Sequence, residues 1–299
     1  MKVGIIGLGK MGLNLALNMK DGRHTPVGFD LNADNLKKAQ EYGIETANSI
    51  DKISKKLDKK KIMWSMVPSG KATDSVMNEL AEVLNQDDIV IDGGNSFYQD
   101  SLRHNEMFKS KGIHFFDVGT SGGTSGARHN GNFMIGGDDR EVFKVIEPLF
   151  ESIAQKDGYL YTGKAGSGHY LKMVHNGIEY GMMASIGEGF EVLENGPFEY
   201  DNQKVAKVWN NGSVIRSWLM ELAEDAFGGN SSLDDIKGTM HSSGEGRWTL
   251  DEALNQQIST PVIAMALLSR YRSMKNDTFS GKVVSALRNE FGGHEMDKK

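Results

Sequence analysis

The chain has 299 residues, of which 38% are hydrophobic and 25% charged, so it can fold into about two domains with buried cores rather than stay disordered. Its net charge of −6 argues against a nucleic-acid-binding surface, and a bound anion must be held by local basic groups. The absence of cysteine excludes disulfides, thiolate catalysis and cysteine-ligated zinc, and the eight histidines are scattered without the spacing of metal ligands.

The apolar segments predict neither a membrane span nor a signal peptide. The longest uncharged apolar run, residues 261–268, is far shorter than a bilayer requires. The apolar segment near the N-terminus is interrupted by Lys10 and by glycines, and no small-residue cleavage site follows it. We therefore expect a cytoplasmic protein that has no membrane partner.

In chain order, the first half alternates short apolar runs with amphipathic segments. The predicted strands are Lys2–Gly7, Val27–Asp30, Ile62–Val67, Ile89–Asp92, His114–Val118, Asn132–Gly136 and Gly158–Tyr161. The predicted helices between them are Met11–Lys20, Ala33–Tyr42, Ala72–Leu84, Gln99–Lys111 and Glu141–Phe150. This alternation indicates βαβ units and a mostly parallel sheet. The lysine-rich run at residues 51–61 is interpreted as the solvated face of a further helix.

The pattern changes near Lys164. From there onward the periodicity is helical, and it begins with a long helix over about Ser167–Asn195 that a Gly-Pro pair ends. The sequence therefore predicts an α/β domain at residues 1–164 and an all-helical domain at residues 165–299.

A glycine-rich motif, Gly7-Leu8-Gly9-Lys10-Met11-Gly12, directly follows the first strand and opens a helix. In that context the glycines let the backbone approach a pyrophosphate, and the helix N-terminus offers N–H groups and a partial positive charge. The second strand ends in Asp30, whose carboxylate would accept a hydrogen bond from a ribose 2′-hydroxyl and repel a 2′-phosphate. We expect a doubly wound sheet of the Rossmann type that binds NAD in preference to NADP, with Val67 and Asn95 as further cofactor contacts.

The long helix carries a polar stripe formed by Lys172, His175, Asn176 and Glu179. Their spacing of i, i+3, i+4 and i+7 places the four side chains on one helical face. A solvated face would have the same spacing, but asparagine and histidine are poor choices for an exposed helix interior. A lysine beside a cofactor cleft can lose its proton through desolvation and act as a general base, and a carboxyl group nearby can act as the acid.

Two further segments follow predicted strands. The glycine-rich segment at residues 119–128 is interpreted as a loop that offers hydroxyls and N–H groups to a carboxylate or phosphate, although a flexible linker has the same composition. The segment Asp-Gly-Gly-Asn-Ser at residues 92–96 lies at the sheet edge where open α/β sheets bind ligands. Both segments are candidates for contacts with a ligand.

Together these segments resemble the decarboxylating 6-phosphogluconate dehydrogenases. The resemblance spans essentially the whole chain and rests on GLGKMG at 7–12, DGGNS at 92–96, SGG at 121–123, KMVHNGIEY at 172–180 and GRWT at 246–249. KMVHNGIEY is highly specific, since the wider β-hydroxyacid dehydrogenase superfamily shares only its Lys and Asn. In length the chain resembles the short form of the family. The NADP-using long form has Asn-Arg where this chain has Asp30 and Leu31, which again favours NAD.

The resemblance implies a reaction and the residues that perform it. Lys172 would take the proton of the substrate 3-hydroxyl while a hydride moves from C3 to the nicotinamide. The β-keto acid would then lose CO2, and Glu179 would protonate the enediol at C1 to give ribulose 5-phosphate, with His175 and Asn176 assisting and no metal required. The implied substrate contacts are Asn95, Ser121, Gly122, Gly123, His175, Asn176, Tyr180, Arg247, Arg270, Arg288 and His294.

The C-terminal segment resembles the part of the long form whose Arg and His complete the phosphate site of a neighbouring subunit. Arg288 and His294 keep the spacing of that pair, and residues 283–291 have helical periodicity. A frayed, charged C-terminus is the alternative interpretation. The resemblance implies a homodimer or homotetramer.

Two other functions fit part of the pattern. An NAD-dependent β-hydroxyacid dehydrogenase with another, unphosphorylated substrate would keep Lys172 and Asn176 but would not need the arginines. An inactive dinucleotide-binding sensor would be expected to lack the pair of base and acid, whereas Lys172 and Glu179 are both present.

Overall fold

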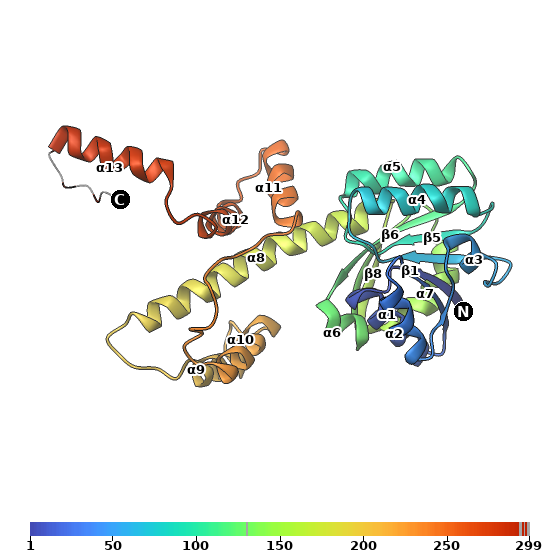
Figure 1. Cartoon of the computed structure of the whole chain (residues 1–299), viewed down its shortest axis with the longest axis horizontal. Coiled ribbons are helices and arrows are strands. Elements are labelled where there is room, and N and C mark those ends of the chain that lie inside the picture. Colours follow the sequence, from blue (N-terminus) through green and yellow to red (C-terminus); the bar gives the residue numbers. More distant parts are fainter. Residues whose placement is uncertain (130, 293–294, 296, 298–299) are drawn as a thin grey trace. The chain divides into compact units, whose positions relative to one another are not determined.

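The structure, a computed structural model, describes residues 1–129, 131–292, 295 and 297 (Figure 1). The chain divides into two compact units, Met1–His175 and Asn176–Lys299. This division falls inside a long helix, and the domain boundary expected from the sequence stays a prediction. Within the described residues, no helix combines the length and the apolar composition that a membrane span requires.

The first unit is built on one eight-stranded sheet. Its strands are β1 (Lys2–Ile6), β2 (Thr25–Phe29), β3 (Glu45–Thr46), β4 (Ile62–Ser65), β5 (Ile89–Asp92), β6 (His114–Ser121), β7 (Gly131–Gly136) and β8 (Ala154–Gly163). They lie in the order β3-β2-β1-β4-β5-β6-β7-β8, and all neighbours are parallel except β6 and β7. The strand order reverses between β1 and β4, and open α/β sheets bind ligands at such a point.

Helices cover both faces of this sheet (Figure 1). They are α1 (Lys10–Asp21), α2 (Ala33–Glu41), α3 (Ile50–Ser54), α4 (Lys71–Val83), α5 (Tyr98–Lys109), α6 (Gly123–Arg128), α7 (Arg140–Ile153) and the beginning of α8 (Ser167–Glu194). Successive strand residues point to opposite faces, so Trp64 of β4 joins the core beneath α1 and α7, while Met63 joins the core beneath α3, α4 and α5. The doubly wound sheet predicted from the sequence is confirmed.

Three local expectations were wrong. The two-residue strand β3 was missed because so short a segment has no readable periodicity. The lysine-rich run is helical only through Ser54, the last residue of α3. The glycine-rich segment expected to be a loop instead continues β6 to Ser121 and forms α6. Glycine disfavours helix, but α6 packs along α1, where Arg128 also forms an ion pair with Asp21, and this tertiary packing stabilises α6.

In the described residues beyond Gly163, the chain forms helices and no strand, as the sequence predicts. The second unit holds the end of α8, followed by α9 (Asn202–Asn210), α10 (Trp218–Gly229), α11 (Glu245–Asn255), α12 (Pro261–Ser273) and α13 (Phe279–Gly292). Two small apolar cores occur here, one around Tyr180 of α8 and Leu267 of α12, the other around Phe190 of α8 and Met220 of α10.

The cap of α7 offers a test of the fold. Asp139 accepts hydrogen bonds from the backbone N–H groups of Glu141 and Val142, both at 3.0 Å. We expect Asp139→Ala to lower the free energy of unfolding by about 1 kcal/mol, because these two N–H groups lose their acceptor. Urea unfolding followed by circular dichroism measures this. Asp58→Ala, at an exposed position outside the helices, is the control; an equal effect of both substitutions would contradict the capping argument.

Candidate active site

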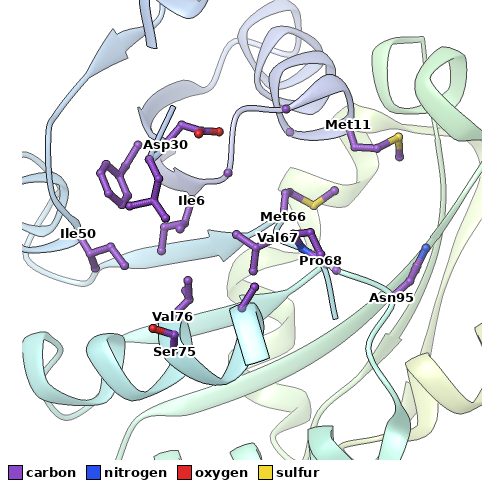
Figure 2. A pocket seen from close by; sticks show the side chains of 18 of the residues that line it. Ile6, Met11, Asp30, Ile50, Met66, Val67, Pro68, Ser75, Val76 and Asn95 are labelled. Carbon is purple, nitrogen blue, oxygen red and sulfur yellow. The ribbon is translucent and has the colours of Figure 1, made fainter. Parts of the chain in front are cut away.

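The reversal of strand order between β1 and β4 opens into a cavity of about 740 Å³ (Figure 2). Met66, Val67 and Pro68 continue from β4 along its middle, and Asp30 and Asn95 appear at opposite ends of the view. Of the nine predicted cofactor contacts, eight line the cavity: Gly7, Gly9, Lys10, Met11, Gly12, Asp30, Val67 and Asn95. The ninth, Leu8, has a buried side chain that does not line the cavity.

Three glycines shape the turn from β1 into α1, each for a different reason. Gly7 has φ +91°, and a Cβ there would lie 2.7 Å from the backbone oxygen of Met66. A Cβ at Gly12 would lie 1.8 Å from the oxygen of Gly7, so no side chain fits. A Cβ at Gly9 would meet nothing within 4 Å, so at this position the backbone is open to a ligand.

The first turn of α1 is free to bind an anion. Its N-cap is Gly9, which has no side chain to cap the helix. The first N–H groups of a helix have no partner within the helix and carry a partial positive charge. This turn therefore fits the pyrophosphate of a dinucleotide.

Asp30 is held rigidly at the edge of the same cavity. Its carboxylate accepts hydrogen bonds from the backbone N–H of Leu8 at 2.6 Å, the backbone N–H of Asn32 at 2.7 Å and the side chain of Asn35 at 3.1 Å. Leu8 thus acts through its backbone, while its side chain is buried. Oδ2 accepts two of these hydrogen bonds and Oδ1 only one, so Oδ1 keeps acceptor capacity for a ribose hydroxyl.

Part of the cavity wall was missed from the sequence. Ala72, Ser75, Val76 and Glu79 line it from α4, with a spacing of i, i+3, i+4 and i+7. This spacing marks one helical face and could have been recognised, but the stripe contains no glycine or paired charges to distinguish it from an ordinary helix face.

Near the other end of the cavity, a chain of polar contacts runs from β6 to α8. The side chain of Ser121 lies 3.2 Å from Nε2 of His175, and Nδ1 of His175 lies 3.4 Å from Nζ of Lys172. Lys172 is only 5% exposed. Gly119 makes room for it, because a Cβ there would lie 2.3 Å from the Cβ of Lys172. The structure thus brings three predicted site residues together.

Asn95 and the predicted glycine pair adopt backbone conformations that set their direction. Asn95 has φ +52°, and its side-chain amide pairs with the backbone of Thr120, accepting at 3.0 Å and donating at 3.3 Å. Gly122 and Gly123 have φ +102° and +58°, which other residues rarely adopt. They turn the chain directly after Ser121.

Two more residues of the predicted stripe lie further along α8. Asn176 is buried and Glu179 is half-buried. Both belong to the second unit, whereas Lys172 and His175 belong to the first. α8 is continuous through all four positions, so the helical spacing expected from the sequence is present.

Two of the predicted phosphate ligands meet in the second unit. The guanidinium of Arg270 stacks 3.8 Å from the ring centroid of Tyr180 and donates a hydrogen bond to the backbone oxygen of His241 at 2.7 Å. The hydroxyl of Tyr180 accepts from the backbone N–H of Ser243 at 3.0 Å. Ser243 was missed, because its role depends on this long-range contact.

The structure does not bring the other phosphate candidates that it describes, Arg247 and Arg288, to this pair. Arg247 is exposed and forms an ion pair with Asp251 at 3.4 Å. Arg288 is exposed on α13, and His294 lies outside the described residues. Among the residues that the structure describes, no group of three acidic or histidine side chains is arranged to hold a metal ion.

Comparison with known proteins gives matches along the whole chain. Residues 2–163 match the family model of the NAD binding domain of 6-phosphogluconate dehydrogenase, and residues 168–299 match that of its C-terminal domain. The chain is 41% identical to the NAD(+)-dependent, decarboxylating 6-phosphogluconate dehydrogenase of Haloferax volcanii, covering 100% of this chain and 99% of that one. It is 54% identical over its full length to YqeC of Bacillus subtilis, whose own assignment as a 6-phosphogluconate dehydrogenase is provisional.

The fold is also similar to that of a solved 6-phosphogluconate dehydrogenase structure. A structure of Plasmodium falciparum 6-phosphogluconate dehydrogenase aligns with a TM-score of 0.84 at 26% identity, covering 100% of this chain and 66% of that one. Two family models that together cover nearly every residue, and a full-length relative at 41% identity, lead to one conclusion. The chain belongs to the 6-phosphogluconate dehydrogenase family.

Proposed function

We propose that the chain is an NAD-dependent dehydrogenase that converts 6-phosphogluconate to ribulose 5-phosphate and CO2. The observation that carries this proposal is the buried amine of Lys172, in reach of His175, which in turn contacts Ser121. A shielded amine with an oriented neighbour is suited to take a proton from a hydroxyl group. The family membership of the chain supports the same reaction.

The residues around the cavity would hold the cofactor. The glycine turn that begins at Gly7 and the first turn of α1 would bind the pyrophosphate, and Asp30 would accept hydrogen bonds from the adenosine ribose. Val67 and Asn95 would contact the remaining part of the dinucleotide. NAD, when bound, accepts a hydride from C3 of the substrate.

Lys172 and Glu179 would divide the proton transfers between them. Lys172, as a neutral amine, takes the proton of the 3-hydroxyl and later returns it to the C3 carbonyl oxygen. The polarised carbonyl accepts the electron pair that the departing CO2 leaves behind, and an enediol forms. Glu179 then protonates C1 of this enediol while Lys172 takes back the proton of the neighbouring hydroxyl, and the ketone of ribulose 5-phosphate forms. His175 orients the amine, and Asn176, one turn beyond Lys172 on α8, would bind a substrate hydroxyl.

The phosphate would be bound mainly by arginines. Arg270, stacked on Tyr180, is already oriented, which lowers the entropy lost on binding. Arg247 and Arg288 would add charge-assisted hydrogen bonds, and His294 would complete the set. Asn95, Ser121, Gly122 and Gly123 would contact the sugar acid.

Several expectations from the sequence belong to this proposal. Residues 1–164 would bind the cofactor, and residues 165–299 would bind substrate and form the subunit interface. The active form would be a cytoplasmic homodimer or homotetramer that binds neither nucleic acid nor membrane.

A single assay tests the proposed reaction. The purified protein is incubated with NAD and 6-phosphogluconate, and both the ultraviolet absorbance of the reduced nicotinamide and the release of CO2 are measured. Gluconate, which lacks the phosphate, is the matched control substrate. Activity with 6-phosphogluconate but not with gluconate supports the proposal. Equal activity with the two substrates would favour a dehydrogenase of unphosphorylated hydroxy acids.

Asp30 should determine the choice of cofactor. We expect kcat/KM for NAD to exceed that for NADP by more than about tenfold, or about 1.4 kcal/mol, because a 2′-phosphate would lie against the carboxylate. Asp30→Asn combined with Leu31→Arg should reduce this preference. Asp34→Asn removes the same charge from a nearby position outside the cavity lining and should leave the preference unchanged. Equal kcat/KM values for the two cofactors in the unaltered protein would contradict the assignment.

The base and the acid should be separable by substitution. Lys172→Ala should abolish oxidation and decarboxylation together, since both require the amine. Glu179→Gln should lower kcat by about 10²–10⁴-fold while leaving the dissociation constant of NAD nearly unchanged. Glu188→Gln, at an exposed position on the same helix, is the control. Near-normal turnover of the Glu179 variant would show that another group donates the proton.

The C-terminal helix should act on a neighbouring subunit. Phe279, Val283 and Leu287 of α13 are spaced i, i+4 and i+8 and are 79%, 41% and 57% exposed, which suits packing on another chain. We expect a mixture of Lys172→Ala and Arg288→Ala proteins to regain activity, because one site of the hybrid combines an intact Lys172 with the partner's intact Arg288. No recovery after confirmed subunit exchange would mean that Arg288 acts within its own subunit or not at all.

A further inference from the structure

A fully buried carboxylate, that of Asp117, lies at the beginning of the helix that carries Lys172. Asp117 is on β6 and has no exposed surface. Its Oδ1 accepts a hydrogen bond from the backbone N–H of Gly166 at 2.6 Å, and its Oδ2 accepts one from the backbone N–H of His169 at 2.8 Å. Both carboxylate oxygens therefore bind the backbone where α8 begins. Asp117 is not among the described residues that line the cavity.

Burying the charged carboxylate of Asp117 lowers the stability of the folded protein. Burial raises the pKa of Asp117, although nearby His169 and the two hydrogen bonds partly oppose the effect. A carboxylate at a helix N-terminus is favourable, but full removal from water disfavours its charge. An asparagine would fill the same volume without that cost. Groups that a fold retains at such cost are common at functional sites.

The contacts around Asp117 leave α8 little freedom to move. A Cβ at Gly168 would lie 2.4 Å from the backbone oxygen of Met134 and 2.5 Å from that of Asp117, so helix and sheet touch backbone to backbone. One turn later, Lys172 lies against Gly119, where a Cβ would lie 2.3 Å from its own Cβ. A shift of the first turn of α8 would therefore move Lys172 relative to β6.

We propose that Asp117 is a positioning residue for the reaction: by holding the first turn of α8 through Gly166 and His169, it sets the place of the Lys172 amine. Lys172 lies three residues beyond His169, on the same side of the helix. The 3.2 Å contact between Ser121 of β6 and His175 of α8 depends on this placement, as does the packing of Lys172 against Gly119. The proposal rests on the proposed function, because it assigns Lys172 as the base.

The main test compares two aspartate variants. In Asp117→Asn the amide oxygen can accept only one of the two N–H groups, so the first turn of α8 loses one attachment. The matched control is Asp138→Asn, because Asp138 accepts from the backbone N–H of Ala165 at 3.1 Å, directly before Gly166.

We expect Asp117→Asn to lower kcat by about 10–100-fold, the effect typical of a misplaced catalytic group, with KM for NAD changed less than about twofold. The deuterium isotope effect with substrate deuterated at C3 should rise, since the step that uses Lys172 becomes slower. Asp138→Asn should keep kcat within about twofold.

Three results would overturn the proposal: normal kcat in the Asp117 variant, an unchanged isotope effect, or an equal loss in the control. Circular dichroism checks that each variant is folded. If Asp117→Asn does not fold, Asp117→Ser keeps one acceptor in a smaller volume and is judged by the same criteria.

A second measurement needs no substrate. The rate at which formaldehyde and a borane reductant methylate Lys172 is followed by mass spectrometry in the unaltered protein and both variants. A displaced amine should react at least about threefold faster in Asp117→Asn than in the other two proteins, since it loses its packing against Gly119. Equal rates would overturn the proposal. Inactivity of the unaltered protein with 6-phosphogluconate would instead refute the proposed function, and the methylation rates would still decide the role of Asp117.

Discussion

Contact of backbone with backbone, between the first turn of α8 and the sheet beneath it, decides where Lys172 and His175 lie relative to β6. Gly168 touches the backbones of β6 and β7, and no side chain fits between them. Lys172 follows one turn later and enters the space that Gly119 leaves open. Because protein interiors are close-packed, a helix pinned in this way has few alternative positions. His175 of the same helix thereby meets Ser121 of β6, while its other ring nitrogen lies 3.4 Å from the amine of Lys172.

Glycines also shape the cavity at the point where strand order reverses. There Gly7 and Gly12 let β1 pass into α1 without a clash, and Gly9 leaves the helix end uncovered. One buried or partly buried carboxylate stabilises each of the two regions, the edge of the cavity and the beginning of α8, in a different way. Asp30 is held at the cavity edge by N–H donors and can still receive a ligand, whereas Asp117 is enclosed and binds only the chain itself.

In the second unit, the guanidinium of Arg270 is already oriented. Arg270 lies over the ring of Tyr180, and the hydroxyl of that tyrosine is held by Ser243. A guanidinium stacked on an aromatic ring keeps its planar donors oriented, which suits a phosphate better than a freely rotating lysine would. Gly246 packs against the Tyr180 ring, where a Cβ would lie 2.5 Å from it, and so places Arg247 directly after this contact.

The sequence by itself determined the features that depend on neighbours along the chain. Strand and helix periodicity predicted the Rossmann-type sheet and the long helix, and the motif beginning at Gly7 marked one side of the cavity. The stripe on α8 was readable for the same reason, since helical spacing alone brings Lys172 and His175 onto one face.

Only the tertiary structure decided which distant segments meet. Local glycine content predicted a loop where packing on α1 stabilises α6, and nothing near Asp117 in the sequence reveals that it binds α8. The stacking of Arg270 on Tyr180 joins residues ninety positions apart in the chain. Hydrogen bonds and close contacts of this kind depend on the register of separate elements, and local propensity carries no record of that register.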